Sequence, residues 1–221
     1  MATPLEMTLV YASGAVVPYL IGSVPFGFLI GKMKGLDIRT QGSGNIGATN
    51  VTRVIGKNWG KLCFLLDLMK GILPVVLVSL LVRRGTFDDP CGILPAIAAL
   101  ATVCGHIYPV YLHFRGGKGV LTAATMILLL DPLIFLVLFV VFALVLLITR
   151  YVSLASVIAA MCYPAAVYYS SDLSVGRPTF SLVFALFVGA LVIFMHRSNI
   201  YRIFNNQESK FSFHKKKDEK K

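Results

Sequence analysis

The chain of 221 residues is 57% hydrophobic and only 14% charged, and its formal net charge is +11. This composition excludes a soluble globular protein and is typical of a chain that crosses a membrane several times. The four cysteines are scattered without C-x-x-C spacing, so they indicate neither a disulfide framework nor a metal site. The first residues lack a basic region and a cleavage site, and we expect the first apolar run to be retained.

Seven apolar runs predict seven membrane-spanning helices. They cover residues 7–30, 62–81, 93–112, 120–130, 133–148, 152–169 and 180–195. The fourth run is short, because its eleven residues reach only about 16 Å as a helix, roughly half of a hydrocarbon core. Asp131 and Pro132 then interrupt what would otherwise be one long run to Ile148.

The distribution of basic residues decides the number of crossings. With seven crossings and the N-terminus outside, seventeen of the 21 Lys and Arg residues lie in cytoplasmic segments, and only Arg83, Arg84 and Arg177 lie outside. With six crossings this bias is lost. The sequence therefore predicts an all-α polytopic membrane protein with seven transmembrane helices, some of them short, and a cytoplasmic C-terminus. The positive charge then follows from topology and from attraction to anionic lipid, and it requires no nucleic acid as a partner.

The end of the chain differs from the rest in composition. Residues 205–221 are polar and rich in lysine, whereas no internal repeat divides the residues before them. We therefore expect a single transmembrane domain over residues 1–204 and a basic, flexible cytoplasmic tail over residues 205–221.

A polar stretch runs from residue 42 to residue 53, between the first two apolar runs. Its glycines, Gly42, Gly44 and Gly47, let a backbone approach a ligand closely and direct N–H groups at an anion. The remaining polar members, which add hydroxyl, amide and guanidinium donors, are Ser43, Asn45, Thr49, Asn50 and Arg53. The stretch predicts a site for a phosphate or carboxylate, although a tight polar turn between helices would also need glycines.

The same glycines spell G-x-G-x-x-G, and Asp67 follows near the position of a ribose-binding acid. That fingerprint requires a preceding strand and a surrounding βαβ unit. Here it follows a long apolar run, and Asp67 lies inside another one. We therefore reject a dinucleotide-binding domain.

A second polar stretch, residues 105–119, ends in Arg115-Gly116-Gly117-Lys118-Gly119. Its glycines lie between two cations and open the next predicted helix, whose N–H groups would face a bound anion. The stretch is not a P-loop, because Leu112 stands in place of the first Walker glycine and Gly119 follows the lysine. The alternative for Lys118 is a basic side chain that extends from a helix end to the membrane surface.

A third cluster contains Arg150, Ser153 and Ser156 at the start of the sixth run. The two serines share one helix face at i, i+3. Serines in membrane helices often bond only their own backbone, which weakens this signal.

A fourth cluster, residues 196–202, ends the last run. His196 and Asn199 share one helix face, and Ser198 and Arg202 share another. A cationic helix end that obeys the positive-inside rule is the alternative explanation for Arg197 and Arg202.

Asp67 and Lys70 lie inside a predicted span, where charged groups are costly. At i, i+3 they can pair with each other, so they form either a structural ion pair or a wall of the site. His106 is expected to be a hydrogen-bonded core histidine. No two carboxylates are placed for acid–base catalysis and no Cys, His or Asp set has metal spacing, so we expect neither a metal nor another cofactor.

The predicted topology places all four clusters at one membrane face. They indicate a site for phosphate-bearing molecules at the lipid boundary, which suits either an enzyme that joins a soluble phosphate to an acyl chain or a transporter. A transporter is expected to bind its substrate near the midplane, between related halves. The crowding of cations at one interface and the lack of such halves favour the enzyme.

In their order along the chain, these motifs resemble the bacterial acyl-phosphate-dependent glycerol-3-phosphate acyltransferases of the PlsY type. The resemblance extends from Tyr19-Leu20-Ile21-Gly22-Ser23-Val24-Pro25-Phe26-Gly27 to Glu208 and includes Asp37-Ile38-Arg39, Asp67-Leu68-Met69-Lys70-Gly71 and the four clusters. It implies seven helices, an external N-terminus and a cytoplasmic site in the bacterial inner membrane. It also implies acyl transfer from acyl phosphate to the 1-hydroxyl of sn-glycerol 3-phosphate, giving lysophosphatidic acid and phosphate as the first acylation of phospholipid synthesis, with no obligate protein partner.

The chain departs from this family pattern at three positions. Ile46 stands where many members carry proline, and Leu121 replaces the small residue usual after Gly119-Val120. Asn206 stands where glycine is usual. Asn tolerates left-handed backbone better than most residues, so we expect the turn to survive.

For this reaction the residues suggest distinct roles. Lys118, Arg53 and Ser43 would neutralise a phosphate and the charge that develops on the leaving group. The hydroxyl proton passes either to a phosphate oxygen of the donor or to His196, which completes the catalytic set. The residues expected to bind substrate are Gly42, Gly44, Asn45, Gly47, Thr49, Asn50, Gly116, Gly117, Gly119, Arg150, Ser153, Ser156, Arg197 and Asn199.

Overall fold

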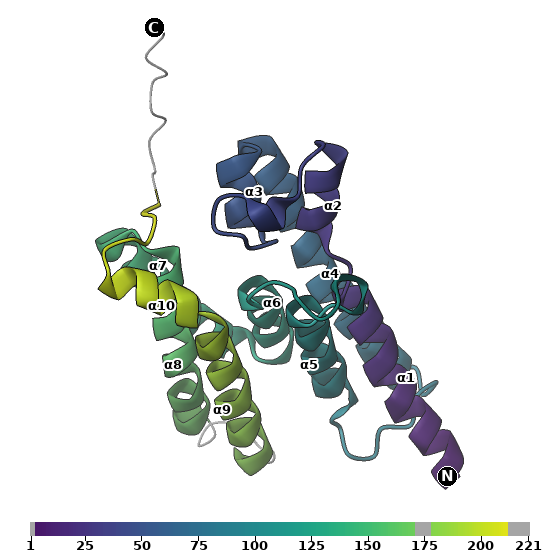
Figure 1. Cartoon of the computed structure of the whole chain (residues 1–221). Coiled ribbons are helices and arrows are strands. Elements are labelled where there is room, and N and C mark those ends of the chain that lie inside the picture. The colour runs from purple at the N-terminus through teal and green to yellow at the C-terminus, as the bar shows by residue number, and fades with distance from the viewer. Residues whose placement is uncertain (1–2, 171–177, 212–221) are drawn as a thin grey trace, which may run out of the picture. The chain divides into compact units, whose positions relative to one another are not determined.

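The computed structural model describes residues 3–170 and 178–211, and the regular structure in these ranges is entirely helical. The chain divides into two compact units, residues 1–132 and residues 133–221, which we call the first unit and the second unit. Figure 1 shows the helices of both units in chain order. The prediction of an all-helical membrane protein is confirmed.

The first unit is built on four apolar helices. These are α1 (Pro4–Gly22), α4 (Lys57–Arg83), α5 (Leu94–Ile107) and α6 (Val120–Leu130), and the shorter α2 (Phe26–Met33), η1 (Ile38–Thr40), α3 (Ala48–Val54) and η2 (Val110–Leu112) connect them. α1 packs along α5, while α4 contacts α3, α5 and α6 (Figure 1). A Cβ on Gly22 or Gly105 would overlap the backbone of the opposite helix, so small residues bring α1 and α5 into close contact.

The first apolar run is broken, whereas the sequence predicted one helix over residues 7–30. α1 ends at Gly22 and α2 begins at Phe26, with Ser23, Val24 and Pro25 between them. Pro25 has no N–H to donate and disfavours helical backbone at the residue before it. The break leaves the Val24 carbonyl outside either helix.

The second unit contains α7 (Pro132–Thr149, whose first residue closes the first unit), α8 (Val152–Ser170), α9 (Pro178–Met195) and α10 (Arg197–Phe204). α8 packs along α9, and α10 contacts both of them. The axis turns by 54° between α9 and α10 (Figure 1). α6 has the predicted bounds, and α7 begins at Pro132, one residue before the predicted start at Leu133.

The number of membrane crossings follows from helix length and composition. Five described segments are long and apolar enough to cross, with residues 4–33 counted as one, and the bent pair α9–α10 makes six. The eleven-residue α6 is shorter than a normal span. Seven crossings therefore require that α6 and the bent pair both cross, and this number stays a prediction. Of the basic residues used to orient the chain, Arg177 and the lysines from Lys215 to Lys221 lie outside the described residues.

Candidate functional site

Asn50 holds the loop between η1 and α3 in shape. Its side chain is buried, and its Nδ2 donates to the carbonyl oxygens of Gln41 at 3.0 Å and of Asn45 at 2.9 Å. Its Oδ1 accepts a hydrogen bond of 2.8 Å from the backbone N–H of Ser43. The side-chain amide of Asn50 thus bonds to the backbone of its own loop and holds the two ends of that loop together.

The glycines of this loop shape the chain, and two of their N–H groups bond within it. Gly42 and Gly44 have left-handed φ angles of 58° and 71°, which side chains disfavour. The N–H of Gly44 donates to Gln41 O at 2.9 Å, and that of Gly47 donates to Asn45 Oδ1 at 2.8 Å. These N–H groups, which we expected to face an anion, therefore serve the loop.

Three exposed side chains of the loop and of α3 carry donor groups that an anion would use. Ser43 lies in a turn of the loop, and Thr49 and Arg53 lie one turn apart on α3. A guanidinium group offers two parallel donors to phosphate oxygens, whereas the hydroxyls offer one each. The outer surface of the loop therefore suits a phosphate.

A buried apolar cluster joins this loop to the second polar stretch. Ile46 and Val51 pack with Ile30, Ile38, Cys63 and Leu112, and Leu112 belongs to η2. Ile46, which replaces the usual proline, is thus a core residue of the loop. The first and second predicted clusters are brought together within the first unit.

The segment 115–119 folds back on the end of α5. The N–H of Gly116 donates to Ile107 O at 3.1 Å, and the N–H of Gly117 donates to His106 O at 3.0 Å. These bonds satisfy carbonyl groups that the end of a helix leaves open. Lys118 follows directly and is half-buried, while Gly119, with a φ of 76°, is the N-cap residue of α6.

Asp67 and Lys70 form the predicted ion pair. Lys70 Nζ lies 2.9 Å from Asp67 Oδ1, and both side chains are buried. Lys70 Nζ also donates a hydrogen bond of 2.7 Å to the Val24 carbonyl at the break between α1 and α2. His106 is buried beside them as expected, but its Nδ1 lies 3.9 Å from Asp67 Oδ1 and has no hydrogen-bond partner among the described residues, so the expected hydrogen bond is not found at this atom.

Glu208 brings the third and fourth clusters together in the second unit. Its Oε1 accepts from Ser153 Oγ at 2.8 Å and from Asn199 Nδ2 at 2.7 Å, and its Oε2 accepts from Arg202 Nε at 2.8 Å. Burial raises the pKa of the Glu208 carboxyl, but the hydrogen bonds from Asn199, Arg202 and Ser153 outweigh it, and the pKa lies below its ordinary value. A charged carboxylate therefore organises this cluster.

Glu208 was not predicted as a site residue, because the sequence places it in the expected flexible tail. Its backbone is held by a turn in which Gln207 N donates to Arg202 O at 2.7 Å and Asn206 N donates to Ile203 O at 3.1 Å. Asn206 has a left-handed φ of 55°, so the expectation that asparagine preserves this turn is confirmed. Residues 212–221 of the predicted tail lie outside the described residues.

The other predicted residues of the second unit have varied surroundings. The Nδ1 of the buried His196 lies 2.8 Å from Val192 O. Because a carbonyl oxygen only accepts hydrogen bonds, Nδ1 carries the proton, and Nε2 is unprotonated in the neutral ring.

Ser156 Oγ donates to Val152 O, one turn earlier in α8. Arg197 is exposed over the ring of Phe194. The exposed Arg150 has a left-handed φ of 63°, and its carbonyl accepts from Phe211 N at 2.7 Å.

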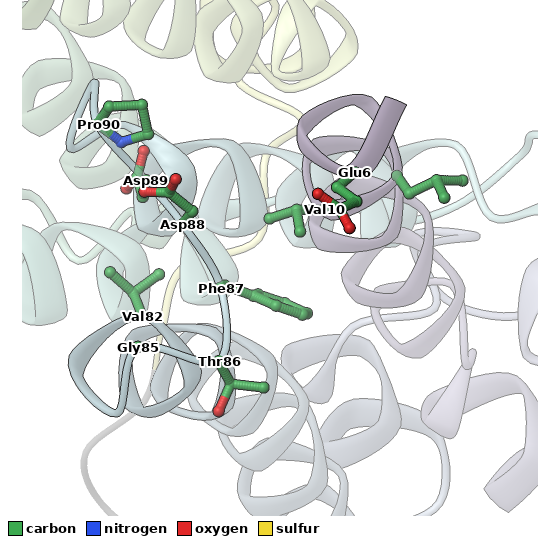
Figure 2. Close-up of a pocket in the computed structure, with 10 residues that line it drawn as sticks. Glu6, Val10, Val82, Gly85, Thr86, Phe87, Asp88, Asp89 and Pro90 are labelled. Carbon is green, nitrogen blue, oxygen red and sulfur yellow. The ribbon is translucent and has the colours of Figure 1, made fainter. Parts of the chain in front are cut away.

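A cavity of about 800 Å³ lies in the first unit, away from both polar loops. Figure 2 shows Glu6 and Val10 of α1 facing the loop over residues 85–90 across it. Asp89 in its wall accepts hydrogen bonds from Tyr11 Oη at 2.8 Å and from Leu94 N at 3.0 Å, so it satisfies the first N–H group of α5. The acidic side chains of the cavity disfavour a phosphate.

Comparisons with known proteins agree with the resemblance. A family model described as "Glycerol-3-phosphate acyltransferase" matches residues 12–206. The glycerol-3-phosphate acyltransferase of Syntrophotalea carbinolica is 45% identical over 87% of this chain and 93% of its own length. The glycerol-3-phosphate acyltransferase of Aquifex aeolicus is 42% identical over 87% of this chain and 95% of its own length.

Two crystal structures of PlsY (YgiH), an integral membrane glycerol 3-phosphate acyltransferase, are also similar. The glycerol 3-phosphate form has a TM-score of 0.77 at 40% identity and covers 91% of this chain and 96% of its own. The lysophosphatidic acid form has a TM-score of 0.74 at 39% identity, with 91% and 95% covered.

Proposed function

Because the chain belongs to the glycerol-3-phosphate acyltransferase family, we propose that it transfers an acyl group from acyl phosphate to the 1-hydroxyl of sn-glycerol 3-phosphate. The products are lysophosphatidic acid and phosphate. The chain is an integral membrane acyltransferase of phospholipid synthesis, and its relatives match it over nearly their full length. This match carries the proposal and removes the transporter hypothesis.

We assign the phosphate of the donor to the first unit. Ser43, Thr49 and Arg53 present donors on the outer surface of one loop, and Lys118 lies in the second loop that packs with it. Acyl phosphate is already activated, so a site that stabilises the departing phosphate needs no covalent intermediate. Cys63, the buried thiol of this region, lies in the apolar cluster behind the loops and is not placed as a nucleophile.

We assign glycerol 3-phosphate to the second unit. Arg150 and Arg197 are exposed cations there, and Asn199 Oδ1 is buried without a hydrogen-bond partner among the described residues. A buried acceptor without a donor is costly, and a substrate hydroxyl would satisfy it. Glu208 accepts a hydrogen bond from Asn199 Nδ2 and thereby fixes the orientation of Asn199 Oδ1.

The proton balance of the reaction leaves two candidate bases. The 1-hydroxyl oxygen bonds to the acyl carbon, the bond from that carbon to the phosphate oxygen breaks, and the hydroxyl proton must be accepted. We propose that a phosphate oxygen of the donor accepts it. His196 is the alternative, because its Nε2 is unprotonated in the neutral ring.

The substitution His196→Gln separates these bases. If substrate phosphate accepts the proton, the variant keeps its turnover number across neutral pH and loses mainly affinity for glycerol 3-phosphate. If His196 is the base, turnover falls by about 10²–10⁴ and the acidic limb of the pH profile disappears.

We further propose seven crossings, an external N-terminus and a site at the cytoplasmic face of the bacterial inner membrane. Single cysteines near Gly47, His113, Arg150 and the C-terminus should react with a membrane-impermeant reagent from the cytoplasmic side only. Reaction of the C-terminus and of residue 47 from opposite sides contradicts this topology.

The donor is tested with purified protein, glycerol 3-phosphate and three alternative donors. Acyl phosphate should support formation of lysophosphatidic acid, whereas acyl-CoA and acyl carrier protein thioester should not. Release of phosphate should require glycerol 3-phosphate. Product formed from a thioester alone would overturn the donor assignment while leaving the acceptor intact.

A further inference from the structure

The buried ion pair Asp67–Lys70 of α4 lies beside His106, a residue of the second polar stretch. Asp67 and Lys70 have side-chain exposures of 4% and 3%, and that of His106 is 7%. Charged groups are costly at such depth in a membrane protein unless they are paired. Asp67 faces both neighbours through one oxygen, at 2.9 Å from Lys70 Nζ and 3.9 Å from His106 Nδ1. The cluster joins α4, α5 and the break after α1.

The other edge of the His106 ring lies against Gly117. A Cβ on Gly117 would overlap His106 Nε2, and no other group comes as close to that position. The N–H of Gly117 also donates to the carbonyl of His106. The φ of Gly117 is not left-handed, so the ring, rather than the backbone angle, requires glycine here.

Gly119, on the other side of Lys118 in the chain, is also fixed in position by its neighbours. Gly119 has a φ of 76°, and a Cβ there would lie 2.6 Å from Ile107 Cδ1. One turn into α6, Thr125 packs so closely on Gly71 of α4 that a Cβ on Gly71 would overlap its hydroxyl. Gly71 directly follows Lys70, so α4 sets the position of both the histidine ring and the start of α6.

We propose that His106, packed beside the buried Asp67–Lys70 pair, is a positioning residue that sets where the backbone places Lys118. The inference rests on the proposed function, in which Lys118 contacts the donor phosphate. Displacement of a catalytic group by about 1 Å can cost on the order of 10²-fold in rate. The buried charges thus act on the reaction through loop geometry and without touching substrate.

A double-substitution cycle tests the contact between the ring and the glycine. Gly117→Ala should lower kcat by about 10- to 100-fold, because the new methyl group pushes the loop off the ring. His106→Ala should lower kcat by about tenfold. In the His106→Ala background, Gly117→Ala should cost nothing further, because the group it meets is gone.

The control substitution is Gly14→Ala, in which the new methyl group meets only the side chain of Leu94, first at its terminal Cδ1. It should keep the kcat of the parent chain. Equal behaviour of Gly117→Ala and Gly14→Ala, or a full additional loss from Gly117→Ala without the ring, would overturn the proposal.

A second variant keeps the test valid if the glycine variants fail to fold. Replacing Asp67→Asn and Lys70→Met together removes both charges at similar volume, a change that buried ion pairs often tolerate. We expect the variant to fold, with a thermal midpoint in detergent lowered only by loss of the Lys70 hydrogen bond to Val24 O, a fall in kcat of about tenfold and little change in the KM of glycerol 3-phosphate. Parental kcat in this variant would show that the pair is only structural and would overturn the proposal.

The kcat of every variant is measured with the acyl donor that the parent chain uses. If the parent accepts a thioester instead of acyl phosphate, the donor assignment fails while the cycle is still measured with the thioester. Failure of the cycle with an active parent refutes the positioning role alone.

Discussion

The two units shape their polar clusters by different means. In the first unit, neutral groups do so: the Asn50 amide bonds to three residues of its own loop, and Gly116 and Gly117 bond to the end of α5. In the second unit, the single carboxylate of Glu208 receives three donors from α8 and α10. A neutral frame is insensitive to pH, whereas a frame built on a carboxylate is lost when that carboxylate is protonated.

The largest effect is expected from Lys118, the cation that the neutral frame presents. Lys118→Ala removes a charge-assisted contact to phosphate, and kcat/KM should fall by about 10²–10³. Lys118→Arg should recover little, because a planar fork does not replace a point charge between packed glycines. Steady-state kinetics measure both, with the exposed Lys61→Ala as the control that keeps activity. Unchanged activity in Lys118→Ala would remove the first unit from the chemistry.

Asn50 tests the neutral frame itself. Asn50→Asp places a second oxygen opposite the carbonyl oxygens of Gln41 and Asn45, while the bond from Ser43 N remains. We expect activity to fall by about 10- to 100-fold and the free energy of unfolding to fall by about 2–3 kcal/mol, because the carbonyls lose their donor. The neighbouring exposed Thr40→Ala is the control. Wild-type thermal midpoint and activity in Asn50→Asp would contradict this account of the loop.

Glu208 tests the charged frame. Glu208→Gln weakens the bonds from Ser153 and Arg202, and the KM of glycerol 3-phosphate should rise by about tenfold. The pKa of Glu208 lies below its ordinary value of 4.5, so its stabilisation is complete above pH 4.5 and is lost as pH falls through the folded-state pKa. Thermal midpoints between pH 7 and pH 3 should fall for the parent chain and fall less for Glu208→Gln, with Ser209→Ala as the control. Parallel curves would show that the carboxylate does not hold this cluster.

The smallest effect is expected at Asn206, in the turn that delivers Glu208. Asn206 has a φ of 55°, where glycine carries no steric cost, so Asn206→Gly should raise the free energy of unfolding by a few tenths of a kcal/mol. Asn205→Gly, one residue earlier with a φ of −93°, should lower it instead. Equal thermal shifts in the two variants would contradict the left-handed turn.

Much of the fold was predictable because apolar runs report helices directly. The bounds of α6 and the break at Asp131 follow from the sequence. The break after α1 was missed, since Pro18 is tolerated inside α1 whereas Pro25 ends it. Hydropathy alone does not distinguish these two prolines.

The site was predictable only where its contacts are local. The hydrogen bonds that shape the loop before α3 join residues fewer than about ten positions apart, so the composition of residues 42–53 was enough to predict a polar loop there. Ser153 and Glu208 are 55 positions apart, and no local pattern links a serine in a membrane helix to an acid in a basic tail. Four glycine N–H groups expected to face an anion instead bond within the protein, because nearby carbonyl oxygens accept from backbone donors; these are Gly44, Gly47, Gly116 and Gly117.

The length of α6 has a consequence for the surrounding lipid. Its eleven residues span about 16 Å against a hydrocarbon core of roughly 30 Å, and charged residues, Lys118 and Asp131, lie just beyond its two ends. If α6 crosses the membrane, as the proposed seven crossings require, the bilayer beside it must thin or admit water, at a cost that grows with hydrophobic mismatch. Vesicles of short-chain lipid relieve that mismatch. Acyl transfer should therefore be faster in thin bilayers than in thick ones, so that membrane thickness itself tunes the enzyme.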